Sequence, residues 1–510
     1  MASSNVLLVS LLSLCFFFLF RRKSKLPLPP GPKGWPLIGN ALDIPAEYEW
    51  KTYHRWSQEL GTDILHLNVA GTHLIILDTL ETAADLMEKR SSIYSNRPIL
   101  PMVTELMGYG FLLPFMDYGT EWRQGRRLMD ELLRPSSMGQ FHPHLLNITR
   151  RMLNKFLEDP ESDAFDTIRH VVGEIVMSIG YGLQVQPHND PFVSTAKEAT
   201  HTLSKASIPG AFLVDAFPIL KYVPEWAPGA GFKTKAREWK KVALKMVNAP
   251  YEAAKANIAS GTFNPSFTSV SLEKMNEGMN PDLYTERNIK NVAGTMYSGG
   301  SDTSLSTISS CILGLLKRPD VVAKAQEELD RVLQPGHLPD FNDQESLPYV
   351  TAIVKEALRW REVAPIAFPH KLKVDDVYKG YRIPAGSMVI ANSWAILHDE
   401  TVYPDPFTFN PDRFIKDGQL DSSVPDPGLA CWGYGRRQCP GRHLAYPSMW
   451  IMIASMLTVF DIRKAVNSEG IVIEPLDETI FGVVSMPKPF KCAITPRSEN
   501  SKRLILAYKS

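Results

Sequence analysis

The sequence predicts a mostly helical protein with a small β region, built as one large unit behind an N-terminal apolar segment. The chain has 510 residues, of which 44% are hydrophobic and 22% charged, and these are ordinary values for a globular protein. Helical periodicity recurs along most of the chain, whereas strand-like alternation is confined to short stretches. Proline and glycine are spread along the body, so no second linker divides residues 35–510.

Charge and cysteine content narrow the function classes. Lys+Arg and Asp+Glu are 55 each, so the formal net charge is zero. Nucleic-acid binding favours a basic surplus, and we therefore expect no nucleic-acid partner. Five cysteines are few and odd in number, which argues against a disulfide scaffold and favours a reducing compartment.

The first 20 residues predict a transmembrane anchor. Residues 1–20 carry no charge, and a helix of that length spans about 30 Å, one bilayer core. Arg21, Arg22, Lys23 and Lys25 follow directly, which places the body in the cytosol. A cleavable signal peptide is the alternative, but it carries its positive charges before the apolar stretch. Residues 21–34 then form a basic and Pro-rich linker to the catalytic domain, residues 35–510.

The first elements of the body are a helix, a hairpin and a second helix. Helical spacing covers Trp50–Leu60 and ends at Gly61. Residues 64–69 and 73–77 have strand-like composition on either side of a short turn, which predicts a hairpin. Thr79 then caps a helix through Arg90.

The second half predicts one long helix and several shorter elements. Thr285–Lys317 fits a single helix about 50 Å long, ended by Pro319. Further helices are expected over Asp320–Leu333 and Tyr349–Arg361, and residues 372–395 alternate like strands. Pro447 should kink a late helix or make its first turns irregular.

The stretch Trp432–Gly441 is the most informative in the chain. It holds Cys439 among glycines, which permit tight turns and the close approach of a flat ligand. A helical pattern follows directly, so the dipole of that helix favours a thiolate. This pattern suits one axial thiolate on an iron, with Arg437 left to meet an anionic group. An inert buried cysteine is the alternative, and zinc or iron–sulfur sites lack a second ligand at the right spacing.

This stretch resembles the haem-binding signature of the cytochrome P-450 superfamily, Phe-x-x-Gly-x-Arg-x-Cys-x-Gly, except that Trp432 replaces the first Phe. Four further motifs resemble the same family in the same order. They are Trp122–Arg126 of its C helix, Gly299–Ser304 of its oxygen-activating helix, Glu356–Arg359 of its K helix and Pro411–Phe414. In detail the chain is most similar to members from basidiomycete fungi.

The resemblance implies the cytochrome P-450 fold and haem b (iron protoporphyrin IX), with the iron axially bound by Cys439. It implies that Trp432 and Gly441 lie beside the cysteine sulfur. The haem propionates would be held by Trp122, Arg126, Arg437 and His370. It also implies a buried structural ion triad of Glu356, Arg359 and Arg413, in which Glu356 and Arg359 share one helix face.

Two polar residues interrupt the long apolar helix. Asp302 and Thr303 follow Gly299 and Gly300, whose missing side chains would leave a notch for dioxygen. We expect Thr303 to hold a water molecule and Asp302 to relay protons from solvent, so that both are catalytic. A helix cap or a threonine bonded to its own backbone is the alternative.

The resemblance also implies where a substrate would lie. The predicted pocket wall is apolar and consists of Leu100, Met102, Met107, Phe111, Phe115, Phe212, Phe217, Val363, Ile366, Phe481 and Val483. A hydrophobic small molecule is therefore expected. Glu105 could pair with an amine, or it could be a solvated loop charge.

The chain has no room for its own flavin domain, so electrons should come from a separate NADPH-cytochrome P-450 reductase. Arg123, Arg127 and Arg436 could offer it a positive docking face. The apolar segment 208–232 and the anchor suggest a body that dips into the membrane. We expect a single-pass protein of the endoplasmic reticulum membrane with its catalytic domain facing the cytosol.

The leading interpretation is a monooxygenase that inserts one oxygen atom of O2 into a hydrophobic small molecule of secondary metabolism, of terpenoid or polyketide type. An indole or tryptamine ring hydroxylase is the alternative substrate class, because residues 62–97 and 363–380 resemble those enzymes. Two alternatives are not monooxygenases. One is a haem-thiolate isomerase or dehydratase, which would need no proton relay, and the other is a haem sensor, which would need no apolar pocket.

Overall fold

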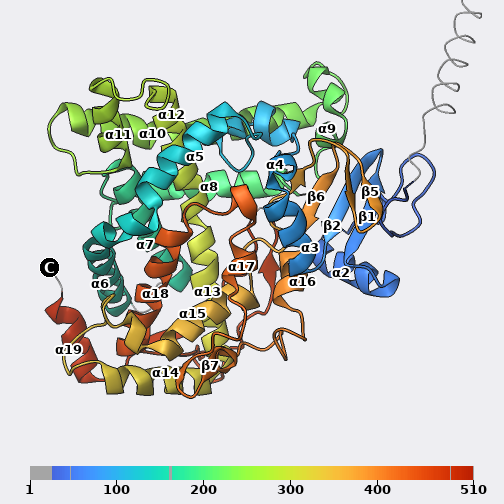
Figure 1. Ribbon diagram of the computed structural model, residues 1–510. Coiled ribbons are helices and arrows are strands. Elements are labelled where there is room, and N and C mark those ends of the chain that lie inside the picture. The colour runs from blue at the N-terminus through green and yellow to red at the C-terminus, as the bar shows by residue number, and fades with distance from the viewer. Residues whose placement is uncertain (1–25, 46, 160–162, 209, 483, 509–510) are drawn as a thin grey trace, which may run out of the picture.

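The computed structural model describes residues 26–45, 47–159, 163–208, 210–482 and 484–508. Helices form the larger body, and a small sheet lies along one side of it (Figure 1). The predicted class, mostly α with a small β region, is therefore confirmed. The predicted anchor, residues 1–20, lies outside the described residues. Within them, no helix is both long and apolar enough to cross a membrane.

The main sheet has four strands in the order β1-β2-β6-β3. The predicted hairpin is confirmed: β1 (Ile64–Val69) pairs antiparallel with β2 (Thr72–Leu77). Strand β6 (Met388–Ala391) lies parallel to β2, and β3 (His370–Lys371) lies antiparallel to β6. The alternating stretch after residue 372 forms β4 (Asp376–Tyr378), β5 (Tyr381–Ile383) and β6, and then turns into helix α16 (Ser393–Leu397).

The described part of the predicted linker is packed against the strands rather than standing free. The carbonyl oxygen of Pro30 accepts the backbone N–H of His66 at 2.8 Å, and that of Pro27 accepts the N–H of Arg382 at 2.8 Å. A Cβ on Gly31 would lie 1.9 Å from the carbonyl oxygen of His66, so only glycine allows this approach. These contacts fix the path of residues 27–31 along the strands.

The first helices begin close to the predicted positions. Helix α2 (Glu49–Leu60) ends at Gly61, whose φ of 59° is left-handed as expected for a C-terminal cap. Thr79 caps α3 (Leu80–Ala83) by accepting the N–H of Thr82. The helix then continues to Lys89 as a π-helix, η1 (Ala84–Lys89), which the sequence did not indicate.

The long central helix is two helices, so the prediction of a single helix over Thr285–Lys317 is wrong at one residue. Helix α12 (Glu286–Ser301) and helix α13 (Thr303–Lys317) meet at Asp302, with φ −105° and ψ −19°. The Thr303 hydroxyl donates to the carbonyl oxygen of Gly299 at 2.7 Å, and such bonds compete with the regular helix ladder. The break coincides with the residues predicted to be catalytic.

Three helices of the second half bury apolar side chains in the core. Helices α14 (Pro319–Val332) and α15 (Pro348–Trp360) lie within one or two residues of the prediction. Helix α18 (Arg442–Val459) runs without interruption through Pro447, so the predicted irregular first turns are not found. Trp450 of α18 is fully buried and donates its indole N–H to the Thr351 hydroxyl at 3.1 Å. Helix α18 continues directly from the end of the cysteine-containing segment into the core.

The remaining elements complete the body. The helices are α4 (Ser91–Tyr94), η2 (Met102–Leu106), η3 (Tyr109–Phe111), α5 (Thr120–Leu133), η4 (Pro135–Phe141), α6 (His142–Glu158), α7 (Ala164–Tyr181), α8 (Pro191–Ala206), α9 (Leu213–Ala216), η5 (Pro218–Tyr222), α10 (Gly231–Ala259), α11 (Phe267–Asn276), η6 (Gln344–Ser346), η7 (Pro411–Phe414), α17 (Gly428–Cys431), η8 (Gly435–Arg437) and α19 (Glu499–Ala507). The short strands are β7 (Ile415–Lys416), β8 (Gln419–Leu420), β9 (Phe460–Lys464), β10 (Thr479–Ile480), β11 (Met486–Pro487) and β12 (Cys492–Pro496).

Candidate active site

The cysteine loop, residues 432–441, connects α17 to α18. The backbone N–H of Cys439 donates to the carbonyl oxygen of Trp432 at 2.8 Å, which closes the loop. Gly435 has φ 55°, and a Cβ there would lie 2.1 Å from the carbonyl oxygen of Met87, so the turn requires glycine. Arg126 of α5 donates to the carbonyl oxygen of Gln438 at 2.5 Å. Helices α5 and η1 therefore hold the loop from outside.

The Cys439 sulfur lies in surroundings that can stabilise a thiolate. Burial raises the pKa of the Cys439 thiol, whereas the backbone N–H of Gly441 and the charge of Arg126 lower it. The Arg442 side chain donates to the carbonyl oxygen of Cys439 at 2.8 Å. A Cβ on Gly441 would stand 3.8 Å from the sulfur. Burial outweighs these groups and leaves the pKa of the thiol raised, so the loop N–H and the nearby cations offset only part of the cost of the thiolate that a metal ligand needs.

Arg437 points away from solvent into the core. It donates to the carbonyl oxygens of Ser95 at 2.8 Å, Leu113 at 3.2 Å and Met116 at 2.9 Å. Its guanidinium lies 4.4 Å from the ring centroid of Trp122. Burial lowers the pKa of Arg437 to about 10. Two of the predicted site residues, Arg437 and Trp122, are thereby brought together.

Arg97 and His370 lie in the same region. Arg97 donates to the carbonyl oxygens of Phe368 at 2.6 Å and Pro369 at 2.7 Å. His370 Nδ1 lies 2.7 Å from the carbonyl oxygen of Tyr94, so this nitrogen carries the proton. Burial, and then the charge of Arg97, hold the pKa of His370 well below its usual value. Burial, and then the charge of Arg437, lower the pKa of Arg97.

Arg97, Arg437 and His370 form what we call the cation cluster. Among the described residues, no carboxylate forms an ion pair with either arginine; Asp117 is near, but accepts only the backbone N–H of Arg97. The Nε of Arg97 is buried without a hydrogen-bond partner in the part of the chain described. Buried charges in proteins are paired, so the cluster requires an anion. The two propionates of a haem fit this requirement.

A second set of buried arginines, unlike the cation cluster, has a carboxylate partner. Arg359 donates to both carboxylate oxygens of Glu356 at 2.8 Å, and Arg413 Nε lies 3.2 Å from Glu356 Oε2. The backbone N–H of Asn410 adds a further bond to Glu356 at 2.8 Å. Both arginines also donate to backbone carbonyls, including that of Thr408. We call Glu356, Arg359 and Arg413 the ion triad, and the structure brings these three predicted residues into contact.

Comparison with known proteins agrees with this geometry. The family model described as cytochrome P-450 matches residues 29–494. Cytochrome P-450 monooxygenase 98 of Postia placenta is 45% identical over 100% of this chain and 98% of its own length. Tryptamine 4-monooxygenase of Psilocybe cyanescens is 42% identical over 97% of this chain and 98% of its own length. A cytochrome P-450 monooxygenase of Armillaria gallica is 42% identical over 96% and 95%.

The chain belongs to the cytochrome P-450 family. It is therefore a monooxygenase that uses O2, a redox partner and a small-molecule substrate. The family's cofactor is haem b with a cysteine thiolate on the iron, and the resemblance to basidiomycete members is confirmed.

In this cytochrome P-450, Asp302 is engaged by a residue that the sequence did not single out. Its buried carboxylate accepts a hydrogen bond from Arg169 of α7. Burial raises the pKa of the Asp302 carboxyl, and the positive charge of Arg169 opposes that rise. A raised pKa suits a group that must carry a proton. Thr303, by contrast, is partly exposed, and its hydroxyl is bonded to the carbonyl oxygen of Gly299.

Gly299 and Gly300 have different surroundings. A Cβ on Gly299 would meet no atom within 4 Å, so this position faces open space. A Cβ on Gly300 would lie 2.7 Å from a methyl group of Val176 on α7. The expected notch therefore comes from Gly299 alone, and Gly300 permits close packing of α12 against α7.

Only some of the residues predicted to form the substrate wall face the interior of the protein. Phe115 packs edge-on against Phe368 with ring centroids 6.0 Å apart, but Phe217 is 49% exposed. Phe481 packs on Tyr48 at 4.3 Å, and Val483 lies outside the described residues. The other wall residues are buried or partly buried: Leu100, Met102, Met107, Phe111, Phe212, Val363 and Ile366.

Glu105 is an ion-pair partner rather than a free acid. Its carboxylate lies 2.7 Å from the ammonium of Lys221, at the surface between η2 and η5. The suggestion that Glu105 pairs with a substrate amine therefore loses its support. The predicted docking arginines, Arg123, Arg127 and Arg436, are all exposed.

Sequence reasoning missed Arg97 and Arg169. Arg97 had a usable signal, because a lone cation opens an irregular stretch that is otherwise rich in apolar residues, Gly and Pro. Arg169 had none, because a single arginine on a long helix reads as a solvated surface residue.

Proposed function

We propose that Cys439 is the axial thiolate ligand of the haem iron, with Trp432 and Gly441 beside its sulfur. We propose further that the cation cluster, Trp122 and Arg126 hold the propionates. The observation that carries this proposal is the cation cluster, which is buried and makes no ion pair with a carboxylate of the described residues. An anionic flat cofactor would supply the missing charge.

When bound, haem b supplies the activation of dioxygen with electrons from the redox partner. The residues of this chain hold and position it. Arg97 and Arg437 are fixed by backbone carbonyls, so their remaining N–H groups are aimed before the cofactor arrives. Nδ1 of His370 already donates to the carbonyl oxygen of Tyr94, so Nε2 can donate to a propionate only when the ring is protonated, and the negative charge of a bound propionate favours that form. Trp122 supports the guanidinium of Arg437 by stacking.

Asp302 and Thr303 are proposed to deliver protons on the distal side. Asp302 can take a proton because burial raises its pKa, and Arg169 can hold the carboxylate between deliveries. The Thr303 hydroxyl donates to Gly299, so its oxygen is left to accept a hydrogen bond from a water or a substrate group. Gly299 leaves the space that such a molecule needs.

The substrate is proposed to be a hydrophobic small molecule of secondary metabolism, of terpenoid or polyketide type. Support comes from the apolar wall residues. A tryptamine-type substrate is the second candidate, because one relative of 42% identity is a tryptamine 4-monooxygenase. Against it, Glu105, the acid that could have paired with the amine of such a substrate, already forms an ion pair with Lys221. Substrate-induced shifts of the haem spectrum across terpenes and tryptamines would decide between the two.

We also propose an endoplasmic reticulum membrane location, with the catalytic domain facing the cytosol. Exposed apolar residues support contact with a bilayer: Trp226 is 84% exposed and Leu37 is 99% exposed. The segments that carry them, around α9 and at the start of the sheet, both lie toward the upper right of Figure 1. The proposed electron donor is an NADPH-cytochrome P-450 reductase that docks on Arg123, Arg127 and Arg436.

The ligand assignment is tested by Cys439→Ser, with Cys431→Ser as the matched control from the same loop region. Cys439→Ser should lose the carbon monoxide difference spectrum of a thiolate-ligated haem together with activity. Cys431→Ser should keep both. A thiolate-type spectrum in Cys439→Ser would refute the assignment.

The proton-delivery role is tested by Thr303→Ala, which removes a hydroxyl but little volume. Haem and substrate binding should stay near normal, while product formed per NADPH falls and hydrogen peroxide rises. Unchanged coupling of NADPH to product would remove Thr303 from the mechanism.

A further inference from the structure

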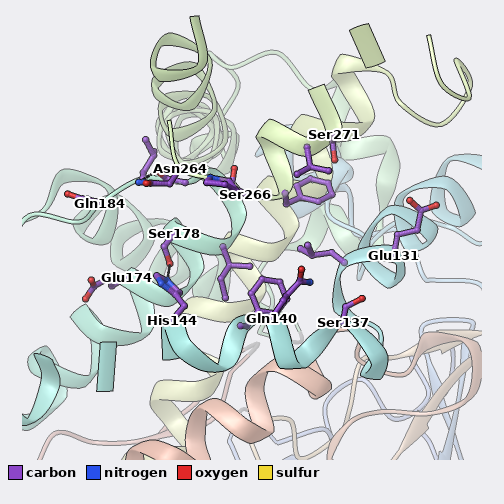
Figure 2. A pocket seen from close by; sticks show the side chains of 18 of the residues that line it. Glu131, Ser137, Gln140, His144, Glu174, Ser178, Gln184, Asn264, Ser266 and Ser271 are labelled. Atoms are coloured by element: carbon purple, nitrogen blue, oxygen red, sulfur yellow. Dashed lines mark hydrogen bonds between the residues drawn. The ribbon is translucent and has the colours of Figure 1, made fainter. Parts of the chain in front are cut away.

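A cleft of about 900 Å³ lies on the helical side of the molecule, apart from the cysteine loop (Figure 2). Its walls come from the end of α5, from η4 and α6, from the end of α7, and from the start of α11. None of its lining residues belongs to the cation cluster, the ion triad or residues 432–441. Its size falls within the range of about 300–1,000 Å³ that is usual for ligand pockets.

The charged groups of this side cleft are already paired with each other. Arg151 forms an ion pair with Glu174. The Tyr284 hydroxyl donates to Glu131 at 2.6 Å and lies 2.9 Å from the ammonium of Lys274. Two basic and two acidic side chains therefore cancel, and the cleft does not select an ion of either sign.

Neutral hydrogen-bonding groups, in contrast, are left unused. Ser271 is only 4% exposed and lines the cleft, and its side chain makes no hydrogen bond to any described residue. Its hydroxyl is therefore open to the cleft rather than sealed in the core, and it is free to donate to a ligand there.

His144 offers a second free group. The Ser178 hydroxyl donates to the carbonyl oxygen of Ile175 at 3.0 Å, so it must accept at its contact with His144 Nε2 at 2.6 Å. Nε2 therefore carries the proton, and Nδ1 of the neutral ring is an unused acceptor. Burial, and then the charge of Arg151, lower the pKa of His144, which keeps the ring neutral. Figure 2 shows His144 beside Ser178 in the cleft wall.

The cleft also has an apolar lining. Leu128, Ile179, Leu183 and Phe267 are buried within it, and Phe141 and Val185 are partly buried. An apolar body can lie against these side chains while polar groups reach Ser271 and His144. This combination is typical of sites for amphipathic ligands.

We propose that the side cleft binds an uncharged amphiphile with an apolar body and at least one hydroxyl donor and one oxygen acceptor. Its hydroxyl donates to His144 Nδ1, and its acceptor receives the Ser271 hydroxyl proton. A hydroxylated metabolite and a sugar-headed lipid share this chemistry.

The test is calorimetric titration of the haem-loaded protein with n-octyl β-D-glucoside, below the concentration at which it forms micelles. Ser271→Ala should weaken binding about 2- to 12-fold, the value of one hydrogen bond. Val270, which lines the cleft and is 43% exposed, can be replaced by Trp without disturbing the core, and Val270→Trp should abolish binding. Val374→Trp, at a 46% exposed position that does not line the cleft, is the matched control and should bind normally.

Two results would overturn the proposal. One is binding that persists unchanged in Val270→Trp, which would place the probe elsewhere. The other is binding of octyl sulfate or octyltrimethylammonium that is tighter than that of the glucoside and is lost in Val270→Trp, because the cleft would then select charge. 1,2-Octanediol separates the two sources: equal binding of diol and glucoside indicates a hydroxylated metabolite, and binding of the glucoside alone indicates a sugar head.

Discussion

The ion triad and the cation cluster each bury two arginines, yet only the triad contains an acid. In the triad, Arg359 and Arg413 share the carboxylate of Glu356, and the remaining N–H groups are satisfied by backbone carbonyls. In the cation cluster, Arg97 and Arg437 have backbone carbonyls but no carboxylate in an ion pair within the described residues. Each arginine of the triad has a carboxylate partner, whereas neither arginine of the cluster is in an ion pair within the described residues.

This difference separates a structural network from a binding site. A buried guanidinium cannot lose its proton at any ordinary pH, so its charge must be met by the protein or by a ligand. A network that is complete should stabilise the fold whether or not a cofactor is present. A network that lacks its anion should contribute mainly when the anion is bound.

The largest effect is expected from breaking the triad. Glu356→Gln keeps the shape of the side chain but leaves two buried guanidiniums without a negative charge. We expect a loss of about 3–5 kcal/mol in the free energy of unfolding, and little folded protein. Urea unfolding followed by circular dichroism measures this. A loss below about 1 kcal/mol would show that the triad is dispensable.

The next largest effect is expected in the cation cluster and should appear in haem binding. Arg97→Met removes one charge-assisted partner of the cofactor, worth about 1.5–3 kcal/mol, or roughly 10- to 150-fold in haem affinity. The stability of the haem-free protein should change little. Removal of a buried unpaired charge stabilises the fold, and this offsets the loss of the hydrogen bonds from Arg97 to two carbonyl oxygens. Haem transfer to apomyoglobin measures the affinity. Arg90→Met, which breaks the ion pair with Asp376 and the hydrogen bond to the carbonyl oxygen of Val377, is the control, and an equal loss there would contradict the comparison.

A smaller effect is expected from His370 as pH changes. Its pKa in the folded chain lies well below the unfolded value of about 6.5, so the unfolded state binds more protons. The stability of the haem-free protein should therefore be retained above pH about 6.5 and fall below it, by at most about 1.4 kcal/mol per pH unit. Bound propionates would raise the pKa of His370 and flatten this slope.

Urea unfolding at several pH values measures this dependence, with His370→Asn as the reference that lacks the titrating ring. Wild type should lose more stability than His370→Asn on acidification without haem, and no more with haem. Equal slopes in haem-free wild type and variant would contradict the assignment.

The comparison also explains what the sequence could predict. The triad was predictable only through the resemblance to the cytochrome P-450 family, because the spacing of Glu356 and Arg359 alone would equally suit a solvated surface pair. The fold class, the hairpin and most helix bounds followed from local periodicity and caps such as Thr79 and Gly61.

What the sequence missed depends on contacts between distant segments. Arg97 comes near Arg437 of η8 and His370 of β3 only when three segments distant in the chain converge, and no local pattern encodes that. The break at Asp302 has the same origin, because the carboxylate is engaged by Arg169 on another helix. The sequence left the role of Glu105 open, and it could not show the partner Lys221, which is far away in the chain.

The smallest effect on stability is expected where a buried acid, rather than a buried arginine, is left alone. Arg169→Met removes the partner of Asp302, but a carboxyl can take a proton and become neutral, which a guanidinium cannot do. The pKa of Asp302, already raised by burial, should rise further. An acid whose folded pKa lies above its unfolded value binds more protons when folded, so its cost grows as pH rises toward the folded pKa. In urea unfolding, Arg169→Met should therefore differ least from wild type at acid pH, where the Asp302 carboxyl is protonated in both, and should lose progressively more stability as pH rises. A loss as large as that of Glu356→Gln, and independent of pH, would mean that Asp302 stays charged without its partner, and the distinction drawn between complete and incomplete networks would fail at this site.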